Sequence, residues 1–126
     1  KMSNSCKNSC ECSQKESIFT AIINRKLPAT ILYEDDLAIV IEDKYPQAPV
    51  HLLVIPKKPI ESISHIQDDD IMLMGHLMKV VRDVARQQKL QSGYRVVVNT
   101  GSDACQAVFH LHLHILAGRK LSPNAG

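Results

Sequence analysis

Several residue types and patterns that mark common protein classes are scarce or missing in this chain. It has no tryptophan, three tyrosines and two phenylalanines, so it lacks the aromatic platforms on which single-stranded nucleic acids stack. The formal net charge is only +2, with both signs mixed along the chain, and no basic stripe is present. There is also no run of eighteen apolar residues, which excludes a membrane-spanning helix. We therefore expect neither a nucleic acid nor a membrane as a partner.

Cysteine is present but is not spread in the way that a disulfide framework requires. Three of the four cysteines, Cys6, Cys10 and Cys12, fall in the first twelve residues, which indicates a reducing compartment. Their spacing matches no common zinc finger and lacks a nearby fourth ligand. No apolar leader segment precedes them, so we expect a cytoplasmic location, with the nucleus as an additional one. Because residues 1–16 have almost no large apolar side chain, we predict a disordered tail.

Residues 17–126 are predicted to form one domain of the α+β class. Ser17 is a plausible N-cap for a short helix that ends near Asn24. Residues 30–34 and 37–41 read as a hairpin, and residues 50–55 as a buried strand. Asp68, Asp69 and Asp70 precede a long amphipathic helix that ends before Gly93. Strands over 94–100 and 108–117 complete the chain, and the absence of βαβ alternation favours an antiparallel sheet.

The last predicted strand contains a strictly alternating run, His110-Leu111-His112-Leu113-His114-Ile115-Leu116. Side chains on a strand alternate between its two faces, so the three histidines should share a face, with neighbouring Cα atoms about 7 Å apart. Histidines this close lower one another's pKa, and neutral imidazoles can act as bases or nucleophiles. His76, on the predicted wet face of the long helix, and His65 receive no role.

The residues alone leave three interpretations of this run open. In the first, the histidines have no function beyond covering an exposed strand face. In the second, they bind a zinc ion with His51 as a third ligand. In the third, one of them attacks a phosphorus atom. In the third case one imidazole forms a phospho-histidine, a second protonates the leaving group, and the loop over residues 101–107 supplies N–H donors to the phosphoryl oxygens.

The run resembles the His-φ-His-φ-His-φ-φ signature of the histidine-triad superfamily. Residues 19–118 resemble its Hint branch, the nucleoside phosphoramidases. Supporting stretches are Pro46-Gln47-Ala48-Pro49, the segment from His51 to Lys58, Gly75-His76-Leu77-Met78, the segment from Gly93 to Asn99, and Gly118-Arg119. The resemblance implies a five-stranded antiparallel sheet with one short and one long helix. It also implies a homodimer that joins two such sheets into one of ten strands.

By the same resemblance, the chain hydrolyses purine nucleoside phosphoramidates and acyl-nucleotides through a nucleotidyl-histidine, without a cofactor or a metal. His112 would be the nucleophile, His114 would contact the phosphate, and His110 and His51 would orient protons. Asp43 would bind the ribose hydroxyls. The phosphate would lie against Asn99, Cys105, Gln106, Ala107 and Val108. The purine would lie in an apolar slot formed by Ile18, Phe19, Ile22, Ile41 and Leu53.

The chain departs from the branch at several positions. Ala107 replaces a serine that helps the leaving group, Cys105 replaces a glycine, and the C-terminal segment lacks a tryptophan. Ser17, Thr20 and Pro59 stand where some relatives have three of the four ligands of a structural zinc, so we predict no such zinc. A dinucleoside polyphosphate hydrolase and a non-catalytic nucleotide-binding or scaffold protein are the alternative functions.

Overall fold

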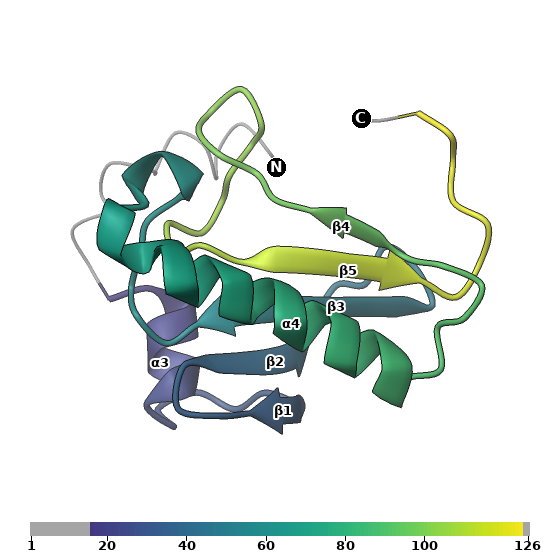
Figure 1. Cartoon of the computed structure of the whole chain (residues 1–126), viewed down its shortest axis with the longest axis horizontal. Helices are drawn as coiled ribbons and strands as arrows, with labels where there is room; N and C mark the ends of the chain where they lie inside the picture. Colours follow the sequence, from purple (N-terminus) through teal and green to yellow (C-terminus); the bar gives the residue numbers. More distant parts are fainter. Residues whose placement is uncertain (1–15, 125–126) are drawn as a thin grey trace.

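A five-stranded antiparallel sheet forms the centre of the computed structural model, which describes residues 16–124. The chain order is α3 (Ile18–Ile23), β1 (Ile31–Glu34), β2 (Ala38–Glu42), β3 (Val50–Pro56), α4 (Ile71–Gln87), β4 (Arg95–Val97) and β5 (Leu113–Ala117). Two short 3-10 helices, η1 (Ile63–His65) and η2 (Asp68–Asp70), precede α4 (Figure 1). The predicted α+β fold is confirmed. The predicted disordered tail lies outside the described residues except for Glu16.

The sheet order, β1-β2-β3-β5-β4, places the strand with the last triad histidine next to the strand with His51. All four pairings are antiparallel, and Leu53 of β3 is the partner of His114 of β5. Because alternate residues of a strand share a face, His51 lies on the same face as Leu53 and His114. This register brings together two histidines that are 63 positions apart in the chain.

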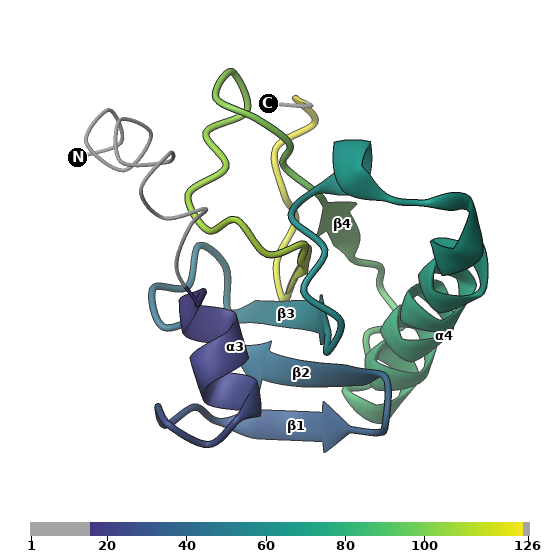
Figure 2. The same cartoon turned by 90° about the vertical axis from the view of Figure 1, so that its left-hand side faces the viewer.

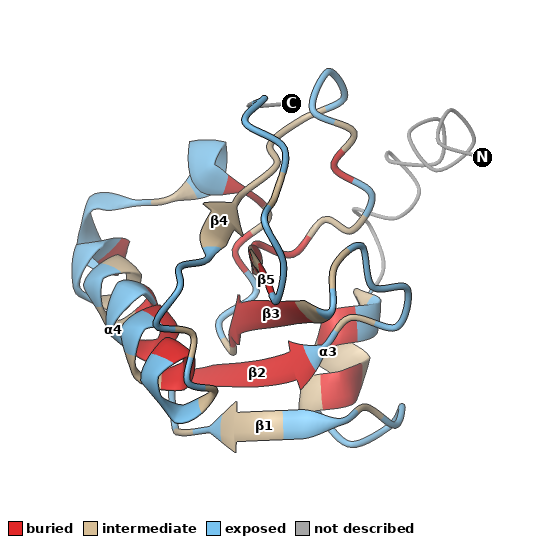
Figure 3. Cartoon of the chain, turned by 90° about the vertical axis from the view of Figure 1, so that its right-hand side faces the viewer, coloured by how far each residue is buried: buried red, intermediate tan, exposed pale blue. Residues whose placement is uncertain are grey.

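The two helices cover opposite faces of the sheet (Figure 2). The α4 face is filled by a core cluster that includes Val40, Leu52, Val54, Ile115, Leu77, Val80 and Val84. The α3 face is filled by a smaller cluster of Phe19, Ile22, Ile39, Ile41, Leu53 and Ile55. Figure 3 shows that β2 and most of β3 are buried, whereas β1 is at most half-buried. The histidines therefore lie on the side of the sheet that carries the smaller helix and the smaller core cluster.

The long helix begins and ends as its flanking residues require. The capping box of Gln67 and Asp70 lies at the start of η2, and Asp70, the last residue of η2, is the N-cap of α4. Lys58 pairs with Asp70. The helix ends at Gln87, and Lys89 then adopts a left-handed conformation with φ of 59°. Among residues 16–124, no helix combines the length and the apolar character needed to cross a membrane.

Two predicted strands are too long. The sheet includes only residues 113–117 of the predicted 108–117 and only 95–97 of the predicted 94–100. Instead of continuing the ladder, the Leu111 N–H donates to the Ile60 carbonyl at 2.6 Å. His110 Nε2 likewise lies 2.8 Å from the carbonyl oxygen of Pro56, the last residue of β3. The triad therefore spans the entry into a strand, and the even spacing predicted for it does not apply to His110.

Candidate active site

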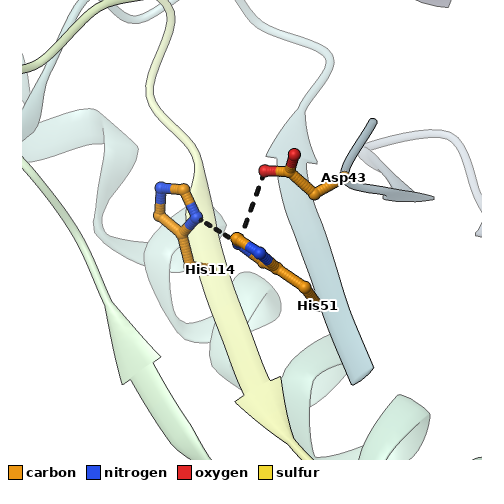
Figure 4. Close-up of side chains that lie close together, drawn as sticks. All are labelled: Asp43, His51 and His114. Atoms are coloured by element: carbon orange, nitrogen blue, oxygen red, sulfur yellow. Dashed lines mark hydrogen bonds and ion pairs between the residues drawn. The ribbon is translucent and has the colours of Figure 1, made fainter. Parts of the chain in front are cut away.

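His51 and His114 form a direct contact across β3 and β5, and Asp43 lies beside them (Figure 4). His51 Nε2 is 2.9 Å from His114 Nδ1 and 3.4 Å from Asp43 Oδ2. Asp43 is placed by the loop that follows β2, where its Oδ1 accepts the Tyr45 N–H at 2.7 Å. No acidic residue is close to the histidine run in the sequence, and the pairing of β3 with β5 brings Asp43 beside it.

The hydrogen bonds assign the protons of this pair. The Gln47 backbone N–H donates to His51 Nδ1 at 2.9 Å, so Nδ1 has no proton and the neutral ring has its proton on Nε2. That N–H donates to His114 Nδ1, because Nδ1 is then an acceptor. Neutral His114 consequently has its proton on Nε2, where it is available to donate to a ligand oxygen.

His112 has the opposite tautomer. Its Nδ1 lies 2.7 Å from the His110 carbonyl oxygen, and a carbonyl only accepts hydrogen bonds, so Nδ1 has the proton. The Nε2 lone pair of His112 is therefore free. The ring is held by an edge contact with Phe19, with centroids 4.9 Å apart and planes at 74°, and it lies 5.1 Å from the His114 ring.

His110 is a buried anchor, with 1% of its surface exposed. Its Nε2–H donates to the Pro56 carbonyl, so its Nδ1 accepts from hydroxyl groups, Ser17 Oγ at 2.9 Å and Thr20 Oγ1 at 3.2 Å. These two hydroxyls belong to α3, where Ser17 also caps the helix as predicted. His110 thus fixes α3, the end of β3 and the entry to β5 to one another.

Burial keeps the triad neutral. Desolvation lowers the pKa of His110 and of His112 below the usual histidine range, and in each case it outweighs a hydrogen bond to a backbone carbonyl. Desolvation, together with the positive charges that His112 and His51 would carry, lowers the pKa of His114 to about 4. All three rings are consequently neutral at neutral pH, with one free lone pair on His112 and one free N–H on His114.

Asp43, His51 and His114 also form a group whose donor atoms lie within 4.8 Å of one another, as metal ligands would. The tautomer of His51 argues against this use. His51 Nε2 already has a proton, and moving that proton to Nδ1 would set it against the Gln47 N–H. A metal ion at this point would have to break the Gln47–His51 hydrogen bond, so a proton-transfer arrangement fits the group better than a zinc shell.

The segment before the triad is organised by Gln106, which is buried. Its Oε1 accepts the Gly101 N–H at 3.0 Å, and its Nε2 donates to the carbonyls of Glu61 and Val108. The side chain of Gln106 therefore shapes this loop and is used in contacts with the backbone. Cys105 is half-buried with φ of 56°, Ala107 is exposed, and Asn99 is half-buried.

Most residues of the predicted purine slot belong to the core under α3. Phe19, Ile22, Ile41 and Leu53 are between 3% and 8% exposed, and Val108 packs against the same cluster. Ile18 is the exception, with 52% of its surface exposed. An apolar ligand at this place would therefore lie against the rim of the α3 cluster and the Ile18 side chain.

The prediction that His76 rests in solvent is wrong. Its Nε2 lies 2.7 Å from Asp35 Oδ2, and its side chain is 25% exposed. Asp35 follows β1, and α4 packs on that face of the sheet, so the contact ties the helix to the β1–β2 turn. This pairing joins residues 41 positions apart, and the helical pattern alone gave no signal for it. His65 is exposed, and its Nδ1 lies 2.7 Å from Ser62 Oγ.

Comparison with known proteins finds close relatives over nearly the whole described chain. Residues 16–125 match the protein family described as scavenger mRNA decapping enzyme C-term binding. An uncharacterized HIT-like protein of Synechococcus elongatus is 48% identical over 108 residues, which cover 86% of this chain and 95% of the relative.

Solved structures show the same fold. The crystal structure of a HIT family hydrolase from Legionella pneumophila superposes with a TM-score of 0.85 at 38% identity, covering 88% of this chain and 100% of that one. A histidine triad nucleotide-binding protein from Candida albicans gives a TM-score of 0.74 at 28% identity, covering 88% and 85% of the two chains.

Proposed function

Because this chain belongs to the histidine-triad (HIT) superfamily, we propose that it is a purine nucleoside phosphoramidase. It would hydrolyse the phosphorus–nitrogen bond of nucleoside phosphoramidates, and the related bond of acyl-nucleotides, to release a nucleoside monophosphate. The observation that carries the proposal is the pair of opposite tautomers. His112 presents a lone pair and His114 presents an N–H, which are the nucleophile and the oxygen-binding donor that attack on phosphorus requires.

In the first half-reaction, His112 Nε2 attacks the α-phosphorus. The nitrogen–phosphorus bond to His112 forms while the bond to the leaving nitrogen breaks, and the leaving nitrogen takes a proton from solvent and departs as the amine. The His112 ring then has a positive charge. The His110 carbonyl, which accepts the His112 Nδ1–H at 2.7 Å, stabilises that charge. In the second half, water attacks phosphorus while the bond from phosphorus to His112 breaks. The monophosphate leaves, the proton lost from water goes to solvent, and His112 returns to its neutral form.

The neighbours of His112 would bind the substrate. We assign the His114 Nε2–H to a phosphoryl oxygen, with His51 holding His114 in the required tautomer through their 2.9 Å contact. Asp43 Oδ2 is 3.4 Å from the His51 N–H, too long for a full hydrogen bond, and so it retains acceptor capacity for ribose hydroxyls. The reaction needs no cofactor, and we expect the chain to act as a homodimer.

Two observations favour a slower or non-catalytic variant of the same site as the alternative. Ala107 offers no hydroxyl to the leaving group, and Cys105 holds a left-handed conformation in the loop before the triad. A protein of that kind would bind nucleoside monophosphates and form no covalent adduct.

The deciding experiment measures both halves of the reaction. Purified protein is incubated with an adenosine phosphoramidate, and turnover is compared with that of His112→Ala and of the exposed-histidine control His65→Ala. We expect wild type and His65→Ala to hydrolyse the substrate, and His112→Ala to lose activity by at least a thousandfold.

Rapid quenching and mass spectrometry should detect adenylate on the peptide that contains His112. Equal turnover rates for wild type and His112→Ala would reject the proposed phosphoramidase mechanism. Binding of the nucleotide without an adenylate on His112 would establish the non-catalytic alternative. Diadenosine polyphosphates are tested as competing substrates. Faster turnover of these than of the phosphoramidate would identify the chain as a dinucleoside polyphosphate hydrolase.

A further inference from the structure

A second concave site is lined by three segments, whose backbone lies on the right-hand side of the molecule in Figure 1, away from α3. It is a pocket of about 640 Å³ between the loop after α4, the start of β4 and the segment that follows β5. Four of its lining residues are basic: Lys89, Arg95, Arg119 and Lys120. None of its lining residues is acidic. Its volume falls in the range of pockets that bind small molecules.

The basic side chains of this pocket have no carboxylate partner among the described residues, whereas most basic side chains elsewhere on the described surface have one. Arg25, Lys26, Lys57, Lys58, Lys79 and Arg82 each face a carboxylate. Within residues 16–124, the four pocket cations have no carboxylate partner, and only Lys44 and Arg86 share that condition. The unpaired basic residues of the described chain are thus concentrated at one concave place, although they come from three separate segments.

Of the four basic residues of the pocket, only Lys89 has a position that local secondary structure explains. Lys89 follows the C-terminal end of α4, where a cation complements the helix dipole. Arg95 and Arg119 are held in place by backbone carbonyls: Arg95 donates to Ser122 at 2.5 Å, and Arg119 donates to Lys120 at 3.1 Å and to Gln47 at 3.3 Å. A guanidinium has five N–H donors, so each arginine keeps several for a ligand. Two positioned arginines are well suited to bind phosphoryl oxygens.

We propose that this pocket binds a small phosphate-bearing anion at a site separate from His112. Arg95 and Arg119 would bind the phosphoryl oxygens, and the exposed Lys89 and Lys120 would add charge at the rim. The ligand belongs to the class of soluble pyrophosphate-type anions, whose negative charge the four basic lining residues would complement.

The pocket is connected to the active site through Arg119. Its guanidinium donates to the Gln47 carbonyl, and the Gln47 N–H fixes the tautomer of His51. An anion that draws Arg119 toward itself weakens its hold on Gln47 and so loosens the segment that positions His51. Occupancy of the pocket should therefore alter kcat more than KM. This part of the inference rests on the proposed function, whereas binding of the anion does not.

The test uses inorganic pyrophosphate and isothermal titration calorimetry at constant ionic strength. We expect saturable binding by wild type, and at least tenfold weaker binding by Lys89→Ala/Lys120→Ala, whose side chains are both exposed. Lys26→Ala/Lys57→Ala removes the same charge at positions that do not line the pocket and should bind as wild type does. His112→Ala should also retain the site, which separates this result from any failure of the phosphoramidase proposal.

Three results would overturn the inference. The first is no saturable binding by wild type. The second is equal weakening by Lys26→Ala/Lys57→Ala, which would mean that only net charge matters. The third is a loss of binding in His112→Ala, which would place the pyrophosphate in the active site. The oligomeric state of each variant is measured by sedimentation in parallel. A change of oligomeric state in Lys89→Ala/Lys120→Ala, without any effect on pyrophosphate binding, would assign the pocket to a contact between subunits. That result would also overturn the inference.

Discussion

Single hydrogen bonds decide which imidazole nitrogen of this site is reactive. The Gln47 N–H and the His110 carbonyl are both backbone groups, and they impose opposite tautomers on His51 and His112. Substitution of neighbouring side chains does not remove these two backbone hydrogen bonds. The rate of the proposed reaction should therefore depend most on groups that face the leaving amine, and the tautomers should tolerate substitution nearby.

The first prediction concerns Ala107, which is exposed beside the triad entry. In Ala107→Ser, a hydroxyl would be added where the proposed leaving group departs, and we expect kcat to rise on the order of tenfold or more. Ala104→Ser adds a hydroxyl elsewhere in the same loop and should leave kcat unchanged. Steady-state kinetics with an adenosine phosphoramidate checks both, and equal effects of the two substitutions would remove Ala107 from the leaving-group site.

The second prediction is the pH dependence. Protonation removes the His112 lone pair, and burial lowers the pKa of His112 below its ordinary 6.5. The value of kcat/KM should therefore be flat down to pH 6.5 and fall only at lower pH. As the pH falls, these histidines are protonated in the unfolded chain before they are protonated in the folded chain, because folding lowers their pKa values. The free energy of unfolding should therefore also decrease from pH 6.5 toward the His114 pKa of about 4. Rate and urea-unfolding profiles between pH 4 and 8 measure both, and a rate midpoint at or above 6.5 would contradict the neutral triad.

At the scale of elements, the β1–β2 turn is organised by one carboxylate. Asp35 Oδ1 accepts the Leu37 and Ala38 N–H groups at 2.8 Å each, and Oδ2 accepts the Tyr33 hydroxyl at 2.6 Å and faces His76 of α4. Burial opposes ionisation of Asp35, but these hydrogen bonds outweigh it and hold its pKa well below the usual range. The turn and the helix thus share a single anchor.

The third prediction compares the two neighbouring aspartates of that turn. Asp35→Ala leaves these donors without their acceptor and should lower the free energy of unfolding by about 2 kcal/mol. Asp36→Ala, which changes an exposed neighbour, should cost less than about 0.5 kcal/mol. Urea unfolding at pH 7 measures the difference, and similar losses for both would show that Asp35 is not the anchor.

The element scale also separates what the sequence predicts from what it does not. Periodicity located α4, the hairpin and β3 because each pattern extends along one continuous segment. The alternation of residues 108–117 predicted too long a strand, because β5 begins only at Leu113, opposite Val54, and the Leu111 N–H before it donates to the Ile60 carbonyl. The proximity of Asp43 to His51 and the contact of Ser17 with His110 depend on how separate segments return to one another. Periodicity carries no such information.

At the scale of the molecule, β4 is the last strand of the sheet, only three residues long and paired on one side. On the same face as α4, several apolar side chains are exposed, among them Met72 at 86% and Met78 at 55%. An edge strand beside an exposed apolar helix face is suited to a second copy of the chain.

The fourth prediction is therefore a dimer whose mass is twice the 14.0 kDa of one chain. Met72→Glu/Met78→Glu should shift it to monomer, because it places four like charges at the two-fold contact. Leu37→Glu, on the distant hairpin, is the control for an added surface charge and should remain dimeric. Light scattering after size exclusion gives the masses, and a monomeric wild type at micromolar concentration would reject the expected ten-stranded sheet.

The hydroxyl of Ser17 has two tasks, since it caps α3 and also faces His110 Nδ1. A cut that removes Ser17 would therefore affect α3 and His110 together. Proteolysis after Glu16 leaves both contacts, whereas removal of one further residue takes away the helix cap and one of the two hydroxyls that face His110, so that only Thr20 remains. If the proposed function is correct, limited digestion that removes this serine should lower turnover, and digestion that stops at Glu16 should not.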